Sequence, residues 1–211
     1  MNQLATIRRA YRYVVAYERR ILDAIARTDE AAREAGFERT TPHRWWPIYS
    51  GFPSRDFAPD RSAWDQLPLY AARFQWDQGE DNAAGSRHLL VDHVADTSYE
   101  ARMLEDKRRT ELDPLEGLPP AEEARSILRF QLVELLTPVP AAEWKLFWSQ
   151  LLPKYFGGNV ASIVPTDTPT VRESGPMRLT TWLVDLETIS GPEAFDAKFI
   201  APLRSSIRRE Q

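Results

Sequence analysis

The densest group of side chains able to perform acid–base chemistry lies between Asp92 and Glu100. It contains Asp92, His93, Asp96, Tyr99 and Glu100, where a predicted strand ends and a predicted helix begins. A helix N-terminus offers free amides and a positive dipole, which suit anion binding. In a catalytic reading, His93 is a general base that Asp96 orients. In a metal-binding reading, His93, Asp96 and Glu100 provide nitrogen and oxygen ligands.

The same stretch has a structural interpretation, which we prefer. Thr97 and Glu100 match a capping box, in which each side chain satisfies a free backbone amide at the start of a helix. The odd spacing of His88 and His93 on a regular strand predicts that they face opposite sides of a sheet. We therefore commit to no metal site and no cofactor, and Asp92, His93, Asp96 and Glu100 stay catalytic candidates only.

Other signatures of common enzyme classes are missing from the sequence. It has no phosphate-binding G-x-x-x-x-G-K-[ST] loop, no dinucleotide-binding G-x-G-x-x-G, no H-E-x-x-H zinc helix and no G-x-S-x-G nucleophile elbow. It also has no cysteine, so thiol nucleophiles, thiolate metal ligands and disulfides are excluded. An active site assembled from distant residues stays compatible with these absences.

A second candidate is the proline-punctuated stretch 38–68, which leads into an aromatic-rich region. Nine of the chain's 23 aromatic residues lie between residues 45 and 76. Trp and Tyr are enriched at binding hot spots because they bury much area with few rotatable bonds. The predicted recognition surface consists of Arg44, Trp45, Trp46, Tyr49 and Trp64. The preferred alternative is that the rings bury themselves against a sheet as a satellite core.

Arginine clusters near both ends of the chain suggest a third hypothesis. Arg8, Arg9, Arg12, Arg19 and Arg20 lie near the N-terminus, and Arg204, Arg208 and Arg209 lie near the C-terminus. If the two terminal helices were adjacent, these groups could form a phosphate-binding stripe for nucleic acid. Five acids in the first helix weaken this reading, and a solvated helix face is preferred.

Charge is distributed unevenly around a formal total of −4. Residues 77–123 sum to −8, whereas the preceding segment sums to +3 and the following one to +1. This acidic belt is either a solvated face or a surface that attracts a basic protein partner. No apolar run is long enough for a membrane span, and arginines interrupt any signal-like N-terminus, so we expect a cytoplasmic protein.

The element that opens the chain is a long amphipathic helix within residues 1–37. Its apolar stripe follows alternating steps of three and four, with Glu18 as a polar interruption, and consists of Leu4, Ile7, Tyr11, Val14, Ile21 and Ile25. Gly36 followed by Phe37 suits a left-handed cap. We expect the stripe to pack against the rest of the chain; the alternative is a heptad seam between two copies in a homodimer.

The later elements are read from periodicity and from turn residues. A hairpin is expected over 69–95, helices over 97–152 (one of them about 120–136), and strands over 159–188. A C-terminal helix over 190–209 begins at a Ser190–Glu193 capping box and is kinked by Pro202.

Together these elements predict one α+β domain over residues 1–211. Its small, mainly antiparallel sheet has about four strands, packed with four to five helices. The preferred function is a non-catalytic protein–protein interaction protein: an adaptor, inhibitor, immunity protein or accessory subunit. A metal-assisted or acid–base hydrolase centred on Asp92–Glu100 is the first alternative, and a nucleic-acid-binding accessory protein is the second.

Overall fold

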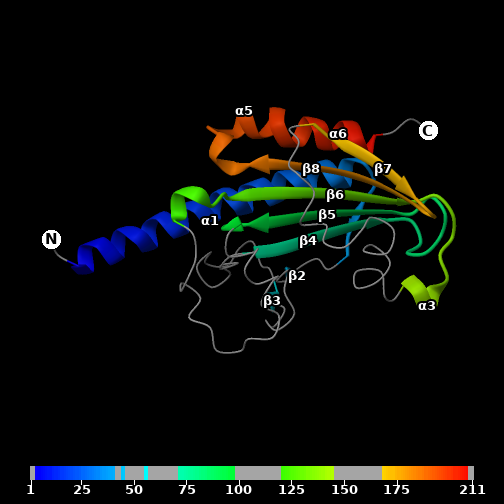
Figure 1. The fold of residues 1–211 in the computed structure, drawn as a ribbon, viewed down its shortest axis with the longest axis horizontal. Helices are drawn as coiled ribbons and strands as arrows, with labels where there is room; N and C mark the ends of the chain where they lie inside the picture. The colour runs from blue at the N-terminus through cyan, green and yellow to red at the C-terminus, as the bar shows by residue number, and fades with distance from the viewer. Residues whose placement is uncertain are drawn as a thin grey trace.

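The computed structural model describes the chain in six ranges. The described residues are 3–40, 44–45, 55–56, 71–97, 120–144 and 168–208. They form an α+β structure in which helices cover one face of an antiparallel sheet (Figure 1). None of the described helices combines the length and apolar character needed to cross a membrane.

The sheet has six strands in the order β1-β4-β5-β6-β8-β7, and every neighbouring pair is antiparallel. The strands are β1 (Glu38–Arg39), β4 (Ala71–Gln78), β5 (Arg87–Val94), β6 (Ile127–Leu135), β7 (Thr170–Ser174) and β8 (Met177–Asp185). A separate pair joins β2 (Arg44–Trp45) to β3 (Arg55–Asp56). The prediction of about four strands was therefore too low, because the two edge strands β1 and β7 carry little periodic signal.

The described residues contain two long helical stretches, against the four to five helices predicted for the chain. In the described part of the chain, only α1 (Gln3–Glu34) and a C-terminal helical stretch exceed about one turn. That stretch joins α5 (Pro192–Phe195), a π-helical segment η6 (Asp196–Ile200) and α6 (Ala201–Ile207). The remaining helical elements are η2 (Ala121–Glu123), α3 (Ala141–Trp144) and η5 (Leu186–Thr188).

The end of α1 has the predicted left-handed cap. Gly36 has a φ of 82°, a conformation that costs glycine no steric clash. Its amide donates to Arg33 and the amide of Phe37 donates to Ala32, the bond pattern of a Schellman motif. Phe37 is buried, so this cap turns the chain from α1 into the sheet.

The hairpin predicted over 69–95 is present as β4 and β5, which pair from Ala71–Val94 to Gln78–Arg87. Phe74 and Trp76 project from β4 toward the helices, as their alternation predicts. β8 is likewise an interior strand with apolar side chains on both faces, as predicted.

The helix predicted over about 120–136 is wrong, because Ile127–Leu135 is strand β6 in the middle of the sheet. β6 pairs along its whole length with β5 and β8, which satisfies its backbone groups on both edges. Apolar residues fill both faces of such a strand, and their spacing then imitates a helical stripe.

The start of the C-terminal helix also differs from prediction. Gly191 is the N-cap, without a side-chain cap bond, and Pro192 follows it, so Ser190 and Glu193 form no capping box. The kink expected at Pro202 stays a prediction; Pro202 is the second residue of α6, and the π-helical segment η6 directly precedes this helix. A proline lacks the amide that would continue a regular helix.

The sheet has two buried faces of different character. The helical face packs α1 and the C-terminal stretch against apolar side chains of β4, β5, β6 and β8. The opposite face has a smaller apolar cluster at one end, to which Val139 and Trp144 contribute. The rest of that opposite face mixes buried polar residues, among them Asp92, Arg129 and Gln131, with the buried apolar residues Val94, Ile127 and Leu183.

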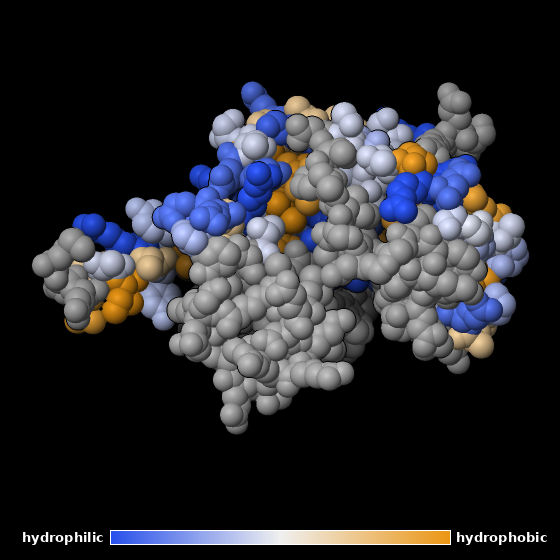
Figure 2. All heavy atoms as spheres, in the orientation of Figure 1, coloured by the Kyte–Doolittle hydropathy of each residue, from blue (hydrophilic) through white to orange (hydrophobic). Residues whose placement is uncertain are grey.

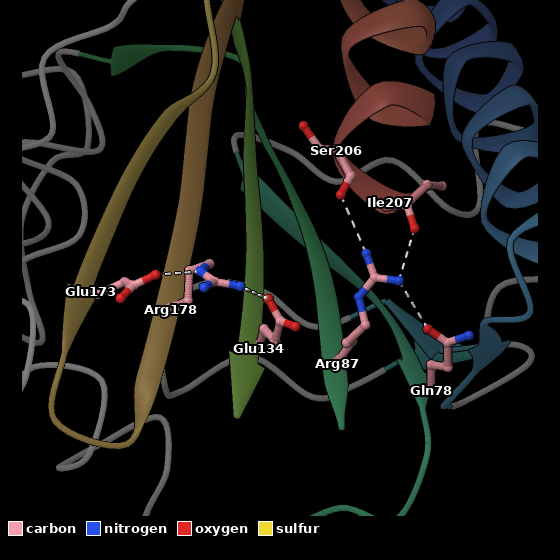
Figure 3. Close-up of polar contacts among 7 residues, drawn as sticks. All are labelled: Gln78, Arg87, Glu134, Glu173, Arg178, Ser206 and Ile207. Atoms are coloured by element: carbon pink, nitrogen blue, oxygen red, sulfur yellow. Dashed lines mark hydrogen bonds and ion pairs between the residues drawn. The ribbon is translucent and has the colours of Figure 1, made fainter. Parts of the chain in front are cut away.

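Arginine side chains fasten the sheet to the C-terminal helix and to its own edge (Figure 3). Arg87 donates to the Oε1 of Gln78 and to the backbone carbonyls of Ser206 and Ile207, at 2.8–3.3 Å. Arg178 bridges Glu134 and Glu173 across three adjacent strands. The hydrogen bonds from Arg87 satisfy two carbonyls at the C-terminus of α6, where carbonyls lack intrahelical partners.

Candidate functional site

The strand β5 places Asp92 and His93 on opposite faces of the sheet. Asp92 shares its face with its cross-strand neighbours Arg73 and Arg129, whereas His93 lies on the face covered by α1. Both side chains are fully buried. The two candidates nearest in sequence therefore do not meet, since successive residues of a strand alternate between faces.

The Asp92 carboxylate is held between two guanidinium groups. Arg73 binds it with two hydrogen bonds of 2.6 and 2.9 Å, and Arg129 Nη1 lies 3.6 Å from Oδ2. A bidentate arginine fixes a carboxylate in orientation as well as in charge. With both oxygens engaged in this way, Asp92 is better suited to holding the sheet face together than to transferring a proton.

His93 contacts the N-terminal helix instead of an acid. Its Nε2 lies 2.7 Å from the hydroxyl of Tyr17, and its buried Nδ1 has no hydrogen-bond partner. Burial lowers the pKa of His93 to about 4, so the ring is neutral at physiological pH. Burial also raises the pKa of Tyr17 to about 12.

The other members of the predicted junction do not complete a metal or catalytic cluster in the described structure. Thr97 exchanges hydrogen bonds with Arg125: its hydroxyl accepts from the Arg125 amide, and its own amide donates to the Arg125 carbonyl. Asp96 is half-buried, and Glu100 lies outside the described residues. Across 3–40, 71–97, 120–144 and 168–208, no three His, Asp or Glu side chains are grouped to hold a metal.

The predicted aromatic recognition surface falls outside what the structure describes. For Arg44 and Trp45 only the backbone is described, in strand β2. Trp46, Tyr49 and Trp64 lie outside the described residues. The hypothesis that these residues bind a partner stays a prediction.

Sequence reasoning missed the polar cluster around His88 and Asp77. His88 Nδ1 lies 2.7 Å from Asp77 Oδ1, and the amide of Gln75 donates to the same carboxylate. Burial would raise the pKa of Asp77, but hydrogen bonds from His88, Thr40 and Gln75 outweigh it and lower that pKa below its ordinary value. The cross-strand pairing of Asp77 with His88 becomes visible only once the hairpin register is known.

Among the described residues on the face that carries His88 and Asp77, Gln131 is the least satisfied polar group. Its side chain is fully buried, and neither the oxygen nor the nitrogen of its amide has a hydrogen-bond partner. An unpaired buried amide is costly to stability.

The feature that differs most from expectation is the N-terminal half of α1. Beyond the end of the sheet this half projects away from the body, and we call residues 4–17 the arm (Figure 1). The stripe residues of the arm are exposed: Leu4 by 62%, Ile7 by 50%, Tyr11 by 68% and Val14 by 42%. Figure 2 shows apolar surface gathered on this projecting end.

The expectation that the whole stripe packs against the chain is therefore wrong for the arm. Ile21 and Ile25 continue the same stripe and are buried in the core. The change occurs at Glu18, whose side chain is only 4% exposed. The periodicity gave the apolar face correctly, but it carries no information about where the sheet beneath the helix ends.

Charged groups of α1 also differ between its two ends. Arg8, Arg9, Arg12, Arg19 and Arg20 are exposed, and in the described structure none of them has an ion-pair partner. Farther along, Arg27 pairs with Asp196, Arg33 with Asp29 and Glu34 with Arg204. Residues 3–17 contain no acid at all, so the arm is a basic amphipathic helix.

The two arginine-rich ends do not join into one stripe. Arg204 pairs with Glu34 at the far end of α1, and about 33 Å of helix separates Glu34 from Arg12. Arg208 is one turn beyond Arg204, and Arg209 lies outside the described residues. The geometry proposed for binding nucleic acid through both ends is thus absent from the described structure.

Comparison with known proteins gives a family but no further relative. The family model PM0109 matches residues 1–163, which include the arm and strands β1 to β6, and the chain belongs to this family. No curated protein and no solved structure matches the chain.

Proposed function

We propose that this member of the PM0109 family is a non-catalytic interaction protein that binds another protein through the arm of α1. The observation that carries the proposal is the exposure of Leu4, Ile7, Tyr11 and Val14 on one face of a projecting helix. Single exposed apolar side chains are ordinary, but a contiguous apolar stripe on a helix is typical of a docking surface.

The energetics of the arm favour a bound state. Helical segments of this length are marginal in water without tertiary packing. Burying four half-exposed apolar side chains would contribute about 1 kcal/mol each, at roughly 25 cal/mol per Å². A partner lying along the stripe would therefore stabilise the arm and gain affinity from the same contacts.

The hydrolase alternative has less support from the described residues. Asp92 is fixed between arginines, and His93 lies on the other face without an acid to orient it. A general base and its orienting group must be within hydrogen-bond reach of one another. The recognition surface predicted from the sequence, which includes Trp46 and Tyr49, is a second candidate for partner binding and stays a prediction.

Site-specific photo-cross-linking in the native cell tests the proposal. A photoreactive phenylalanine analogue at Tyr11 should form adducts with a distinct protein. The same analogue at Arg9, which lies two residues away on the opposite side of the helix, should form few. Adducts of equal yield at both positions, or adducts at neither, would contradict the proposal.

A further inference from the structure

We infer that the partner of the arm presents an apolar helix whose carboxylates lie along one edge. This inference rests on the proposed function and adds the chemistry of the partner. It follows from how arginines are placed around the apolar stripe. The stripe from Leu4 to Val14 is about 15 Å long, so three helical turns of a partner would cover it.

The arginines border the stripe on one edge only. At 3.6 residues per turn, Arg8, Arg12 and Arg19 fall along one side of the line from Leu4 to Val14. The other side is formed by Thr6 and Ala10, which carry no charge, and farther along by Tyr17, which packs against the core at the base of the arm. A partner helix lying along this stripe would therefore meet cations along one edge and small or neutral groups along the other.

These cations are available for a partner. Arg8, Arg12 and Arg19 are exposed and have no ion-pair partner in the described structure, in contrast to Arg27 and Arg33 on the same helix. Carboxylates opposite the free arginines would complement them and select against a basic partner.

A second copy of the chain fits this edge less well. In an antiparallel pair of arms, the arginine edge of one copy would face the arginine edge of the other. In a parallel pair it would face the neutral edge. Neither arrangement supplies the opposite charges that normally fix partner choice along a helical seam.

A lipid surface is also a poorer fit than an acidic helix. Helices that lie on anionic membranes carry basic residues around a broad polar face, with the apolar face sunk between them. On the arm, the flank made by Thr6, Ala10 and Tyr17 has no cation. The arginines along one edge of the stripe instead complement carboxylates along one edge of a partner helix.

The test uses the full chain and two synthetic amphipathic helical peptides. Both have leucines at heptad spacing; one carries glutamates along one edge, and the other carries lysines at the same positions. Fluorescence anisotropy of the labelled peptides should show binding of the glutamate peptide, weakened by added salt, and much weaker binding of the lysine peptide.

Matched variants locate the contact. Arg8→Gln with Arg12→Gln should weaken binding of the glutamate peptide by about tenfold, from the loss of two exposed ion pairs. Arg27→Gln with Arg33→Gln removes the same charge from the same helix and should leave the affinity unchanged. Equal effects of the two double variants would overturn the inference, because binding would then follow net charge alone.

The remaining outcomes separate the inference from the proposed function. If Leu4→Ser with Ile7→Ser abolishes binding of both peptides while their affinities are equal, the arm is a docking surface and the acidic edge is wrong. If the chain binds phosphatidylserine vesicles through Arg8 and Arg12 but ignores the glutamate peptide, a membrane is the occupant and the inference is overturned. If the chain binds neither peptide and no vesicles, the inference is also overturned. The cross-links at Tyr11 test the proposed function separately.

Discussion

The Tyr17 hydroxyl lies 2.7 Å from His93 Nε2, and so joins the base of the projecting arm to the middle strands of the sheet. The next residue of the helix, Glu18, is also buried, and its Oε2 has no hydrogen-bond partner. Two titratable groups, whose pKa values burial shifts in opposite directions, thus lie where the arm leaves the body. Burial lowers the pKa of His93 to about 4 and raises the pKa of Glu18 to about 7.

The first prediction is that the contributions of His93 and Glu18 to stability nearly cancel between pH 4.5 and 6.5, the ordinary pKa values of the two groups. Over that range His93 takes up a proton in the unfolded chain but stays neutral in the folded chain, so acidification destabilises the fold. The folded chain holds the proton on Glu18 more tightly than the unfolded chain, so acidification stabilises it. Glu18→Gln should therefore make stability fall by about 2 kcal/mol on acidification across this range, and His93→Gln should make it rise by a similar amount.

Urea unfolding at several pH values measures these slopes. The two variants should bracket the wild-type chain with slopes of opposite sign. If both variants keep the wild-type slope, neither group is buried as the structure describes.

The second prediction concerns the ion pairs of Asp92. Asp92→Asn leaves two guanidinium groups facing a neutral amide in a buried environment, which should lower the free energy of unfolding by about 3 kcal/mol or more. The matched control is Asp196→Asn, which removes the carboxylate of an exposed arginine pair and should cost less than about 1 kcal/mol. Thermal or urea denaturation compares them; similar costs would count against the burial of Asp92.

The third prediction is that Gln131→Leu stabilises the protein by about 1 kcal/mol, because it removes a buried amide that forms no hydrogen bond and keeps a similar volume. Gln75→Leu serves as the control, since the Gln75 amide donates to Asp77 and its loss should destabilise. If Gln131→Leu is the destabilising change, the amide has a partner in solution, such as a bound water.

The fourth prediction compares two isoleucines on one stripe. Ile25 is buried and Ile7 is half-exposed, so Ile25→Ala should cost about 2–5 kcal/mol and Ile7→Ala less than about 0.5 kcal/mol. Chemical denaturation of the isolated protein supplies both values. A cost at Ile7 approaching that at Ile25 would mean that the arm is packed in solution.

Local signals in the sequence correctly predicted the elements with the clearest periodicity. The α1 stripe, the Gly36 cap, the hairpin and the interior strand β8 all have patterns that depend on neighbouring residues only. β6 was misread because a strand buried on both faces has no alternation, and its neighbours in the sheet decide its conformation.

The candidate site was less predictable because it depends on distant pairings. Asp92 and His93 are adjacent in sequence, yet the pleat of the strand places them on opposite faces. Asp92 there pairs with Arg129, and His93 contacts Tyr17. The exposure of Leu4 and Ile7 depends on the length of the sheet beneath α1, which no local pattern encodes.

The tie between Arg87 and the last turn of α6 spans 120 residues of chain, and α1, the first element, packs against that same terminal helix. A chain emerging from the ribosome therefore exposes the apolar face of α1 until the residues of α6 have been synthesised. Contacts of such long range slow folding and prolong the exposure of sticky intermediates. We therefore expect chaperone dependence during translation, and loss of the fold when the chain is truncated before α6, because α1 is covered only once α6 is present.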